Sequence, residues 1–158
     1  MGGLGILLPM SGRAHRVEEL DQATCRRLIT TVPFGRIAST HRGLPKIVPV
    51  HCTVRGDEIL IGTIQAHNSV RVQPGDVVAF EADSYDPATS EGWSVGVVGP
   101  CRVVADQVEI DELDALGFTP WTVQDGGHYI GLPLGLIYGR ALTTQHHQTA
   151  GPVGRRQR

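Results

Sequence analysis

The chain has 158 residues and a formal net charge of -2, with 41% hydrophobic and 19% charged residues. These values fit one soluble globular domain, and they exclude a chain that is disordered as a whole or a strongly basic nucleic-acid-binding protein. The 20 glycines and 10 prolines indicate many tight turns, which argues against a helical bundle. Three cysteines without a C-x-x-C pair exclude a disulfide framework and favour a reduced, cytoplasmic location.

The two ends of the chain differ in composition from its middle. Residues 1–16 begin with the apolar run Gly2–Met10, which lacks leading basic residues and is far shorter than the roughly 18 residues of a membrane span. Residues 144–158 are polar and end in three arginines. We therefore expect flexible extensions at 1–16 and 144–158 around one domain over 17–143, and no membrane association.

A short helix is expected first. Asp21 is a good N-cap, and an apolar face repeats at helical spacing until Pro33 and Gly35 end the pattern. The residues of that face are Cys25, Leu28, Ile29 and Val32. A second helix is expected over Asp106–Leu116, where Val108, Leu113 and Leu116 lie near one face and Gly117 stops it.

The remaining pattern is one of short strands separated by tight turns. The expected strands are Arg36–Thr40, Leu44–Val54, Glu58–Thr63, Val77–Asp83, Gly92–Val104 and Tyr129–Leu142. The last contains Gly131, Pro133 and Gly135, so it is expected to be kinked or bulged. Six strands and two short helices predict a mainly β fold, arranged as a closed or nearly closed antiparallel barrel.

The two longest strands, Leu44–Val54 and Gly92–Val104, carry apolar residues on both faces. One face fills a barrel, and the other needs a cover. A second copy of the chain is the economical source of that cover, so the pattern favours a homodimer.

No motif identifies a nucleophile, a P-loop or a metal site. His51 and Cys52 are adjacent on a strand and point to opposite faces, so they do not share a ligand. His146 and His147 lie in the polar tail. We therefore expect no metal ion.

Two segments carry local signals, and each has two readings. Trp93 stands at a strand start after Gly92, as a core residue or as a flat wall for a ring system with Ser94 as a polar contact. The segment Ile61–Ser69 leaves a strand for a possible helical turn. It is either a polar connector or a source of backbone N–H groups for a phosphate.

Five pieces of the sequence stand in a characteristic order and spacing: Gly35–Ala38, Pro45–His51, Asp57–Thr63, Val78–Asp83 and Glu91–Val95 with Gly99. Together they resemble the FMN-binding split-barrel family related to pyridoxamine 5'-phosphate oxidase, over about Val17–Leu142. The resemblance implies a six-stranded antiparallel split β-barrel with two or three short helices. It also implies a homodimer with one FMN cofactor at each end of the interface.

By the same resemblance, the first long strand lays its backbone along the flavin ring, and the next strand leads into the phosphate grip. The expected cofactor contacts are Ile47, Val48, Pro49, Val50, His51, Thr63, His67, Asn68, Trp93 and Ser94. The family's grip usually follows an Arg-Thr pair and then a Ser-Lys or Thr-Lys pair. Here Thr63 is present, but Gly62 stands at the arginine position and Asn68 at or near the lysine position.

Neither Gly62 nor Asn68 can supply the positive charge that the family uses to hold the phosphate. Charge-assisted hydrogen bonds of roughly 1.5–3 kcal/mol each are therefore lost unless His67 and Arg71 compensate. Because the FMN site is altered in this way, three functions remain open. The first is an FMN-dependent oxidoreductase acting on a small molecule. The second is a reductase using a deazaflavin coenzyme, whose acidic tail would follow Lys46, Arg42 and Arg71. The third is a non-catalytic dimeric binding module with a decayed FMN site. The substrate is not identified by the sequence.

Overall fold

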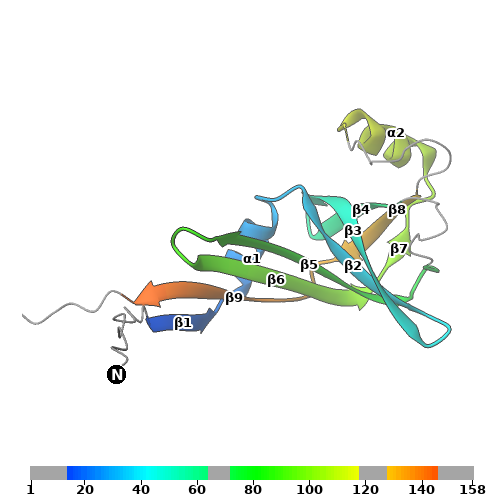
Figure 1. Cartoon of the computed structure of the whole chain (residues 1–158). Coiled ribbons are helices and arrows are strands. Elements are labelled where there is room, and N and C mark those ends of the chain that lie inside the picture. Colours follow the sequence, from blue (N-terminus) through cyan, green and yellow to red (C-terminus); the bar gives the residue numbers. More distant parts are fainter. Residues whose placement is uncertain (1–13, 64–71, 118–127, 146–158) are drawn as a thin grey trace, which may run out of the picture.

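The structure is a computed structural model that describes residues 14–63, 72–117 and 128–145 (Figure 1). Within these ranges the chain forms nine strands and two helices. In chain order they are β1 (Ala14–Glu19), α1 (Gln22–Ile29), β2 (Phe34–His41), β3 (Leu44–Arg55), β4 (Glu58–Thr63), β5 (Val77–Asp86), β6 (Glu91–Pro100), β7 (Arg102–Val103), α2 (Gln107–Ala115), β8 (His128–Pro133) and β9 (Leu136–Gln145).

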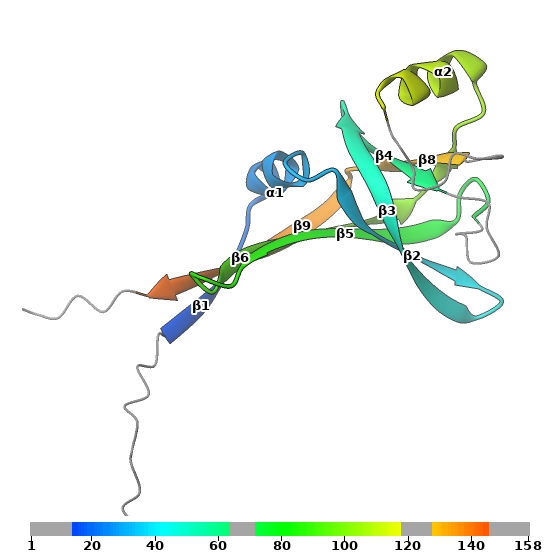
Figure 2. The same cartoon turned by 45° about the horizontal axis from the view of Figure 1, so that its top comes forward.

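All nine strands belong to one antiparallel sheet with the order β1-β9-β6-β5-β2-β3-β4-β8-β7 (Figures 1 and 2). Strands β1 and β7 are its two edges in the described part of the chain, so hydrogen bonds do not close it into a barrel. The predicted mainly β, antiparallel architecture with two helices is confirmed. The structure has nine strands in an unclosed sheet where the sequence predicted six in a closed or nearly closed barrel.

The additional strands have identifiable causes. The expected strand Gly92–Val104 divides into β6 and β7, and Tyr129–Leu142 divides into β8 and β9 at the bend Leu134–Gly135. The kink predicted there is therefore a complete change of partners, because β8 pairs with β4 and β9 pairs with β6. Strand β1 was not predicted, and it pairs with β9 from the far end of the chain.

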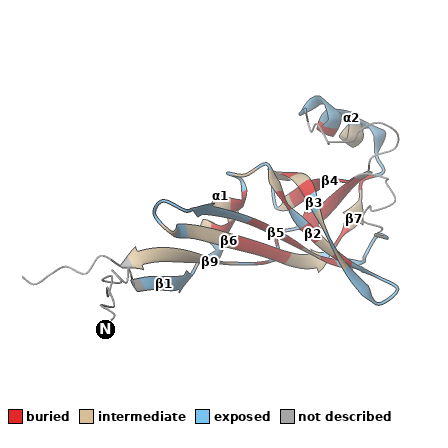
Figure 3. Cartoon of the chain, in the orientation of Figure 1, coloured by how far each residue is buried: buried red, intermediate tan, exposed pale blue. Residues whose placement is uncertain are grey.

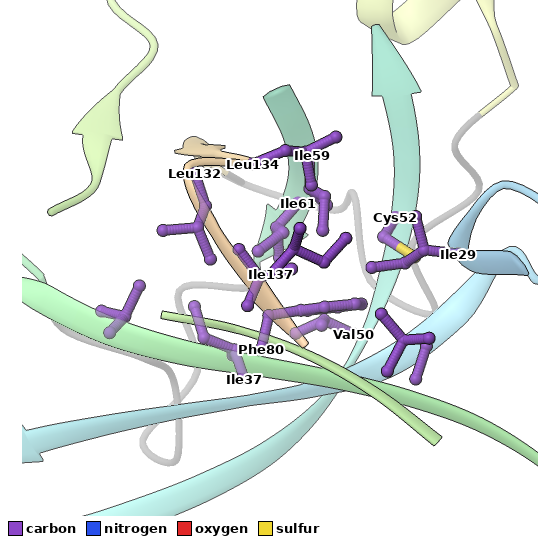
Figure 4. Packing of buried hydrophobic residues seen from close by; sticks show 14 of the residues in the cluster. Ile29, Ile37, Val50, Cys52, Ile59, Ile61, Phe80, Leu132, Leu134 and Ile137 are labelled. Carbon is purple, nitrogen blue, oxygen red and sulfur yellow. The ribbon is translucent and has the colours of Figure 1, made fainter. Parts of the chain in front are cut away.

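The main core lies on the inner side of the curled sheet, where α1 covers one end (Figure 4). Asp21 caps α1 as predicted by accepting a hydrogen bond from the Thr24 backbone N–H at 2.7 Å. Cys25 and Ile29 of this helix are fully buried against the sheet. The strands contribute a buried set that includes Ile37, Val50, Cys52, Ile59, Ile61, Phe80, Val95, Val97, Ile130, Leu132 and Ile137.

A second, smaller cluster joins α2 to the opposite side of β4 and β8. Leu60 of β4 and Tyr129 of β8 pack there with Val104 and with Ile110 and Leu113 of the helix. The predicted apolar face of α2 is corrected, because Val108 and Leu116 are 67% and 61% exposed and only Leu113 of that set is buried. Neither α1 nor α2 is long and apolar enough to cross a membrane.

Polar contacts fasten α2 to the sheet beside this cluster. The Arg102 guanidinium donates to both carboxylate oxygens of Glu58 in β4, at 2.8 and 2.7 Å. The same side chain donates to Glu109 of α2 at 2.9 and 2.6 Å. The Tyr129 hydroxyl donates to the Asp114 carboxylate at 2.5 Å. One arginine and one tyrosine thus connect the helix to β4, β7 and β8.

Candidate functional site

Buried residues gather in the strands near the centre of the sheet (Figure 3), and along β5 they alternate with more exposed ones. In β5, Val78, Phe80 and Ala82 are buried while Val77 and Glu81 are exposed. This alternation of period two places every second residue of β2, β3, β5, β6 and β9 on what we call the outer face. Functional side chains are to be sought there, because the inner face is occupied by the core.

An apolar row crosses the outer face. The register pairs Ile47 with Ala38, Ala38 with Ala79, Ala79 with Val98, and Val98 with Leu136. Because neighbouring strands lie about 4.8 Å apart, these five residues form a row roughly 19 Å long. Its ends are strongly exposed: Ile47 is 69% and Leu136 62% accessible. A row of this kind is a candidate contact surface.

A polar row runs beside the apolar row, again across five strands. It consists of the register-paired residues Pro49, Arg36, Glu81, Gly96 and Tyr138. The adjacent row holds Asp83, Ser94, Arg140 and Glu19. The Arg36 guanidinium donates to the Asp83 carboxylate at 2.5 Å, while both side chains remain about half exposed.

A groove of about 570 Å³ lies over these rows. Its lining includes Ile47, Arg36, Glu81, Ser94, Tyr138 and Arg140. The ring of Tyr138 lies across Gly96, where no side chain obstructs it. The groove therefore combines an aromatic surface, an aliphatic end and side chains of both charges.

His51 lies on the outer face further along β3. Its ring meets Phe34 of β2 edge to face, with centroids 5.3 Å apart and planes at 87°. The Nε2 atom of His51 is buried and has no hydrogen-bond partner in the described part of the chain. Across the next strand pair stands Gly62 of β4, and beyond it Tyr129 of β8. His51 thus marks the boundary between the open face and the part covered by α2.

The residues expected to follow the flavin ring divide by face. Ile47, Pro49 and His51 lie on the outer face, as their register with β2 and β4 shows. Val50 is buried in the main core, and Val48 packs against that core. Their side chains therefore point away from the open surface, and only their backbone faces the neighbouring strands.

The other expected contacts are placed less uniformly. Ser94 lines the groove, whereas Trp93, its neighbour, packs against the main core. Trp93 is only partly buried, so both of its readings stay open. Thr63 is buried at the end of β4. His67, Asn68 and Arg71 lie outside the described residues, so the expected phosphate segment Ile61–Ser69 is described only as far as Thr63.

Sequence reasoning did not single out Arg36, Tyr138 or Arg140, which all line the groove. The signal was present as period-two alternation: Tyr138 and Arg140 flank Gly139 on β9, and Arg36 precedes the buried Ile37. That the three side chains line the same groove follows from the strand register, and the register cannot be predicted from the alternation within single strands.

The cysteines offer no nucleophile. All three are free thiols and buried. Burial raises the pKa of the Cys52 thiol to about 12, so it is protonated at neutral pH. The predicted divergence of His51 and Cys52 is confirmed, since Cys52 lies in the main core while His51 contacts Phe34 on the outer face.

Comparison with known proteins identifies the family. Residues 21–139 match the family model described as pyridoxamine 5'-phosphate oxidase. The chain belongs to this family. The resemblance inferred from the order of the strand motifs is thereby confirmed.

Three known proteins are similar to this chain. The uncharacterized protein Rv0080 of Mycobacterium tuberculosis is 39% identical over 113 residues, covering 68% of this chain and 74% of that protein. A Corynebacterium glutamicum structure, provisionally described as a pyridoxamine 5'-phosphate oxidase, is 25% identical with a TM-score of 0.68, over 82% of this chain and 96% of that one. The FAD binding protein from Mycobacterium smegmatis is 26% identical with a TM-score of 0.61, over 79% of this chain and 97% of that one.

Proposed function

We propose that the protein binds a flavin nucleotide, FMN in the first instance, and uses it to transfer electrons to or from a small molecule. The observation that carries the proposal is the outer face of β3. There the exposed Ile47 and Pro49 are followed by the Nε2 atom of His51, which has no hydrogen-bond partner among the described residues. The FAD-binding relative from Mycobacterium smegmatis supports a flavin as the ligand class.

The side chains on β3 fit a flat, amphipathic ring. A binding site for such a ligand needs a mostly apolar surface with a few placed polar groups. Ile47 and Pro49 provide the first, and His51 provides the second. A bound flavin would supply the redox chemistry, so the protein needs no nucleophile of its own. This agrees with the protonated state of the buried Cys52 thiol.

The proposal includes a homodimer built on the apolar row. The row leaves Ile47 and Leu136 largely exposed at its two ends, and the polar rows beside it carry both Arg36 and Arg140 and both Glu19 and Glu81. In a two-fold interface each patch meets its own copy, so a face with charges of both signs can be complementary to itself. A second copy would bury the apolar row and bring Ile47 and the β3 surface to the interface.

Two alternatives rest on particular residues. Arg42 lies in the turn between β2 and β3, and Lys46 precedes Ile47 on β3; two basic residues at this end of the sheet favour a deazaflavin coenzyme with an acidic tail. Gly62 has no side chain to offer a phosphate, which favours a binding module that no longer holds FMN. In that case, the double change Gly62→Arg with Asn68→Lys creates tight FMN binding.

The test is an absorption spectrum of the purified protein, followed by titration with FMN, FAD and the deazaflavin coenzyme. A bound flavin, or uptake at micromolar concentration or tighter, is the expected result and identifies the electron carrier. If only the deazaflavin coenzyme is bound, that coenzyme takes the place of FMN in the proposed function. No uptake of any of the three rejects the redox function and leaves the binding module.

A further inference from the structure

We propose that His51 fixes the direction in which the flavin ring lies on β3. Its Nε2 atom hydrogen-bonds to the polar pyrimidine edge of the ring, and the apolar benzenoid end lies toward Ile47. This inference rests on the proposed flavin binding and adds to it a positioning residue and a ring orientation.

The first support is a gradient of polarity along one strand. Ile47, Pro49 and His51 are two residues apart in sequence and share the outer face of β3. At about 3.3 Å per residue they span roughly 13 Å, comparable with the length of three fused rings. The aliphatic Ile47 is 69% exposed at one end, and the imidazole stands at the other. A ligand that is apolar at one end and polar at the other matches this gradient in one direction only.

The second support is the unpartnered nitrogen. Buried polar atoms are almost always hydrogen-bonded, and leaving one unpaired is costly. Nε2 of His51 is buried without a partner in the described part of the chain. The residue across from it on β4 is Gly62, which has no side chain that could serve as one. A bound molecule is therefore the natural source of the missing hydrogen bond.

The third support is that the imidazole is held in place. Phe34 packs edge to face against it with centroids 5.3 Å apart, on the adjacent strand β2. A fixed imidazole loses little conformational freedom when it pairs with a ligand, which is the property expected of a positioning group. Either tautomer serves, because the pyrimidine edge offers both carbonyl acceptors and an N–H donor.

His51 could instead contact the phosphate of FMN. A ligand that has the flavin ring but no phosphate distinguishes this contact from one to the ring. The experiment measures the affinity of lumiflavin, which lacks the ribityl phosphate, and of FMN for the wild type, His51→Phe, His51→Gln and the control His41→Phe at the exposed end of β2. We expect His51→Phe to weaken both ligands by about tenfold, because one hydrogen bond is lost. His51→Gln, which retains a hydrogen-bonding group, restores most of that loss. The control changes neither.

The midpoint potential of bound FMN provides a readout that a purely structural role would not move. Loss of a polar partner at the pyrimidine edge is expected to make it more negative in His51→Phe than in His51→Gln. Should His51→Phe fail to fold, the histidine ¹⁵N spectrum of the wild type provides the test. The resonance that disappears in His51→Gln is assigned to Nε2 of His51, and lumiflavin binding is expected to shift it.

Three results would overturn the orientation. A loss confined to FMN assigns His51 to the phosphate, and no loss for either ligand means that water or another group satisfies Nε2. An Nε2 resonance that does not shift when lumiflavin binds also means that His51 does not contact the ring. A wild type that binds neither lumiflavin nor FMN rejects the proposed function itself, which is a separate outcome.

Discussion

The ring of Tyr138 on β9 lies across the backbone of Gly96 on β6, so that a Cβ atom at position 96 would come within 2.5 Å of the Tyr138 Cζ atom. A Cβ atom at Gly35 on β2 would be equally crowded, but by backbone and by a buried ring instead of an exposed side chain. A Cβ there would meet the backbone oxygen of Glu81 at 2.6 Å and the buried ring of Phe80. One glycine accommodates a movable side chain, and the other a fixed backbone.

The stabilities of two alanine variants should reflect this difference. We expect Gly96→Ala to change the free energy of unfolding by less than about 1 kcal/mol, because Tyr138 is 56% exposed and can turn aside. Gly35→Ala should lower the free energy of unfolding by about 1–3 kcal/mol or more, since the added methyl group would overpack the main core. Urea unfolding followed by circular dichroism measures both. Equal losses would show that the Tyr138 ring is as firmly held as the core.

The proposed dimer predicts a specific effect of Leu136→Asp. Leu136 ends the apolar row, and in a two-fold interface a carboxylate there would be buried against apolar side chains of the second copy. We expect the dimer dissociation constant to rise by about a hundredfold or more. Val108→Asp, at a residue of similar exposure on α2, is the matched control and should change nothing. Sedimentation equilibrium checks both; a Leu136→Asp protein as dimeric as the wild type would remove the row from the interface.

Local patterns in the sequence determine much of this fold. The Asp21 cap and the spacing of Cys25 and Ile29 predict α1, and the turn at Arg55–Asp57 places β4 at Glu58–Thr63, the range that the structure shows. Strand β1 was missed because, in the ranges that the structure describes, it pairs with β9 alone, more than a hundred residues later. The exposed face of α2 was missed for a related reason, because Leu60 and Tyr129 of the sheet decide which side of the helix is buried.

The candidate site was accessible to sequence reasoning only in part. The motif around Ile47 and His51 pointed to β3, and Ser94, expected as a polar contact, lines the groove. Alternation within β9 could mark Tyr138 as outward-facing, but its place over Gly96 follows from the register of two strands. The unpartnered nitrogen of His51 depends on what surrounds it in space, which no local pattern contains.

Arg102 should contribute more to stability than an ordinary surface arginine. It pairs with both Glu58 and Glu109, whose side chains are only 21% and 22% exposed, so Arg102→Ala leaves two partly buried carboxylates facing each other. We expect a loss of about 1–3 kcal/mol, between the values for exposed and buried pairs. Arg55→Ala, which removes the exposed pair with Glu112 at 2.8 Å, is the control and should cost about 0.5 kcal/mol or less. Urea unfolding that gives the same loss for both would show that Arg102 adds nothing beyond a surface pair.

Burial of Cys52 predicts that stability declines in alkaline solution. The pKa of its thiol rises from the ordinary value of 9.0 to about 12 in the folded protein, because burial disfavours the thiolate. The unfolded chain therefore loses this proton first as the pH rises above 9. The contribution of the protonated thiol is complete below pH 9 and is lost progressively toward pH 12. Burial, together with Asp114, also raises the pKa of Tyr129, which acts in the same direction.

Cys52→Ala separates the thiol from the other groups that titrate in this range. We expect the wild-type free energy of unfolding to fall between pH 8 and pH 10.5, and the fall to be smaller in the variant. The variant is less stable than the wild type at pH 8, since a buried sulfur is removed from the main core. The difference between the two proteins therefore narrows as the pH rises. Parallel pH profiles of urea unfolding would show that the Cys52 thiol ionises as readily in the folded protein as in the unfolded chain.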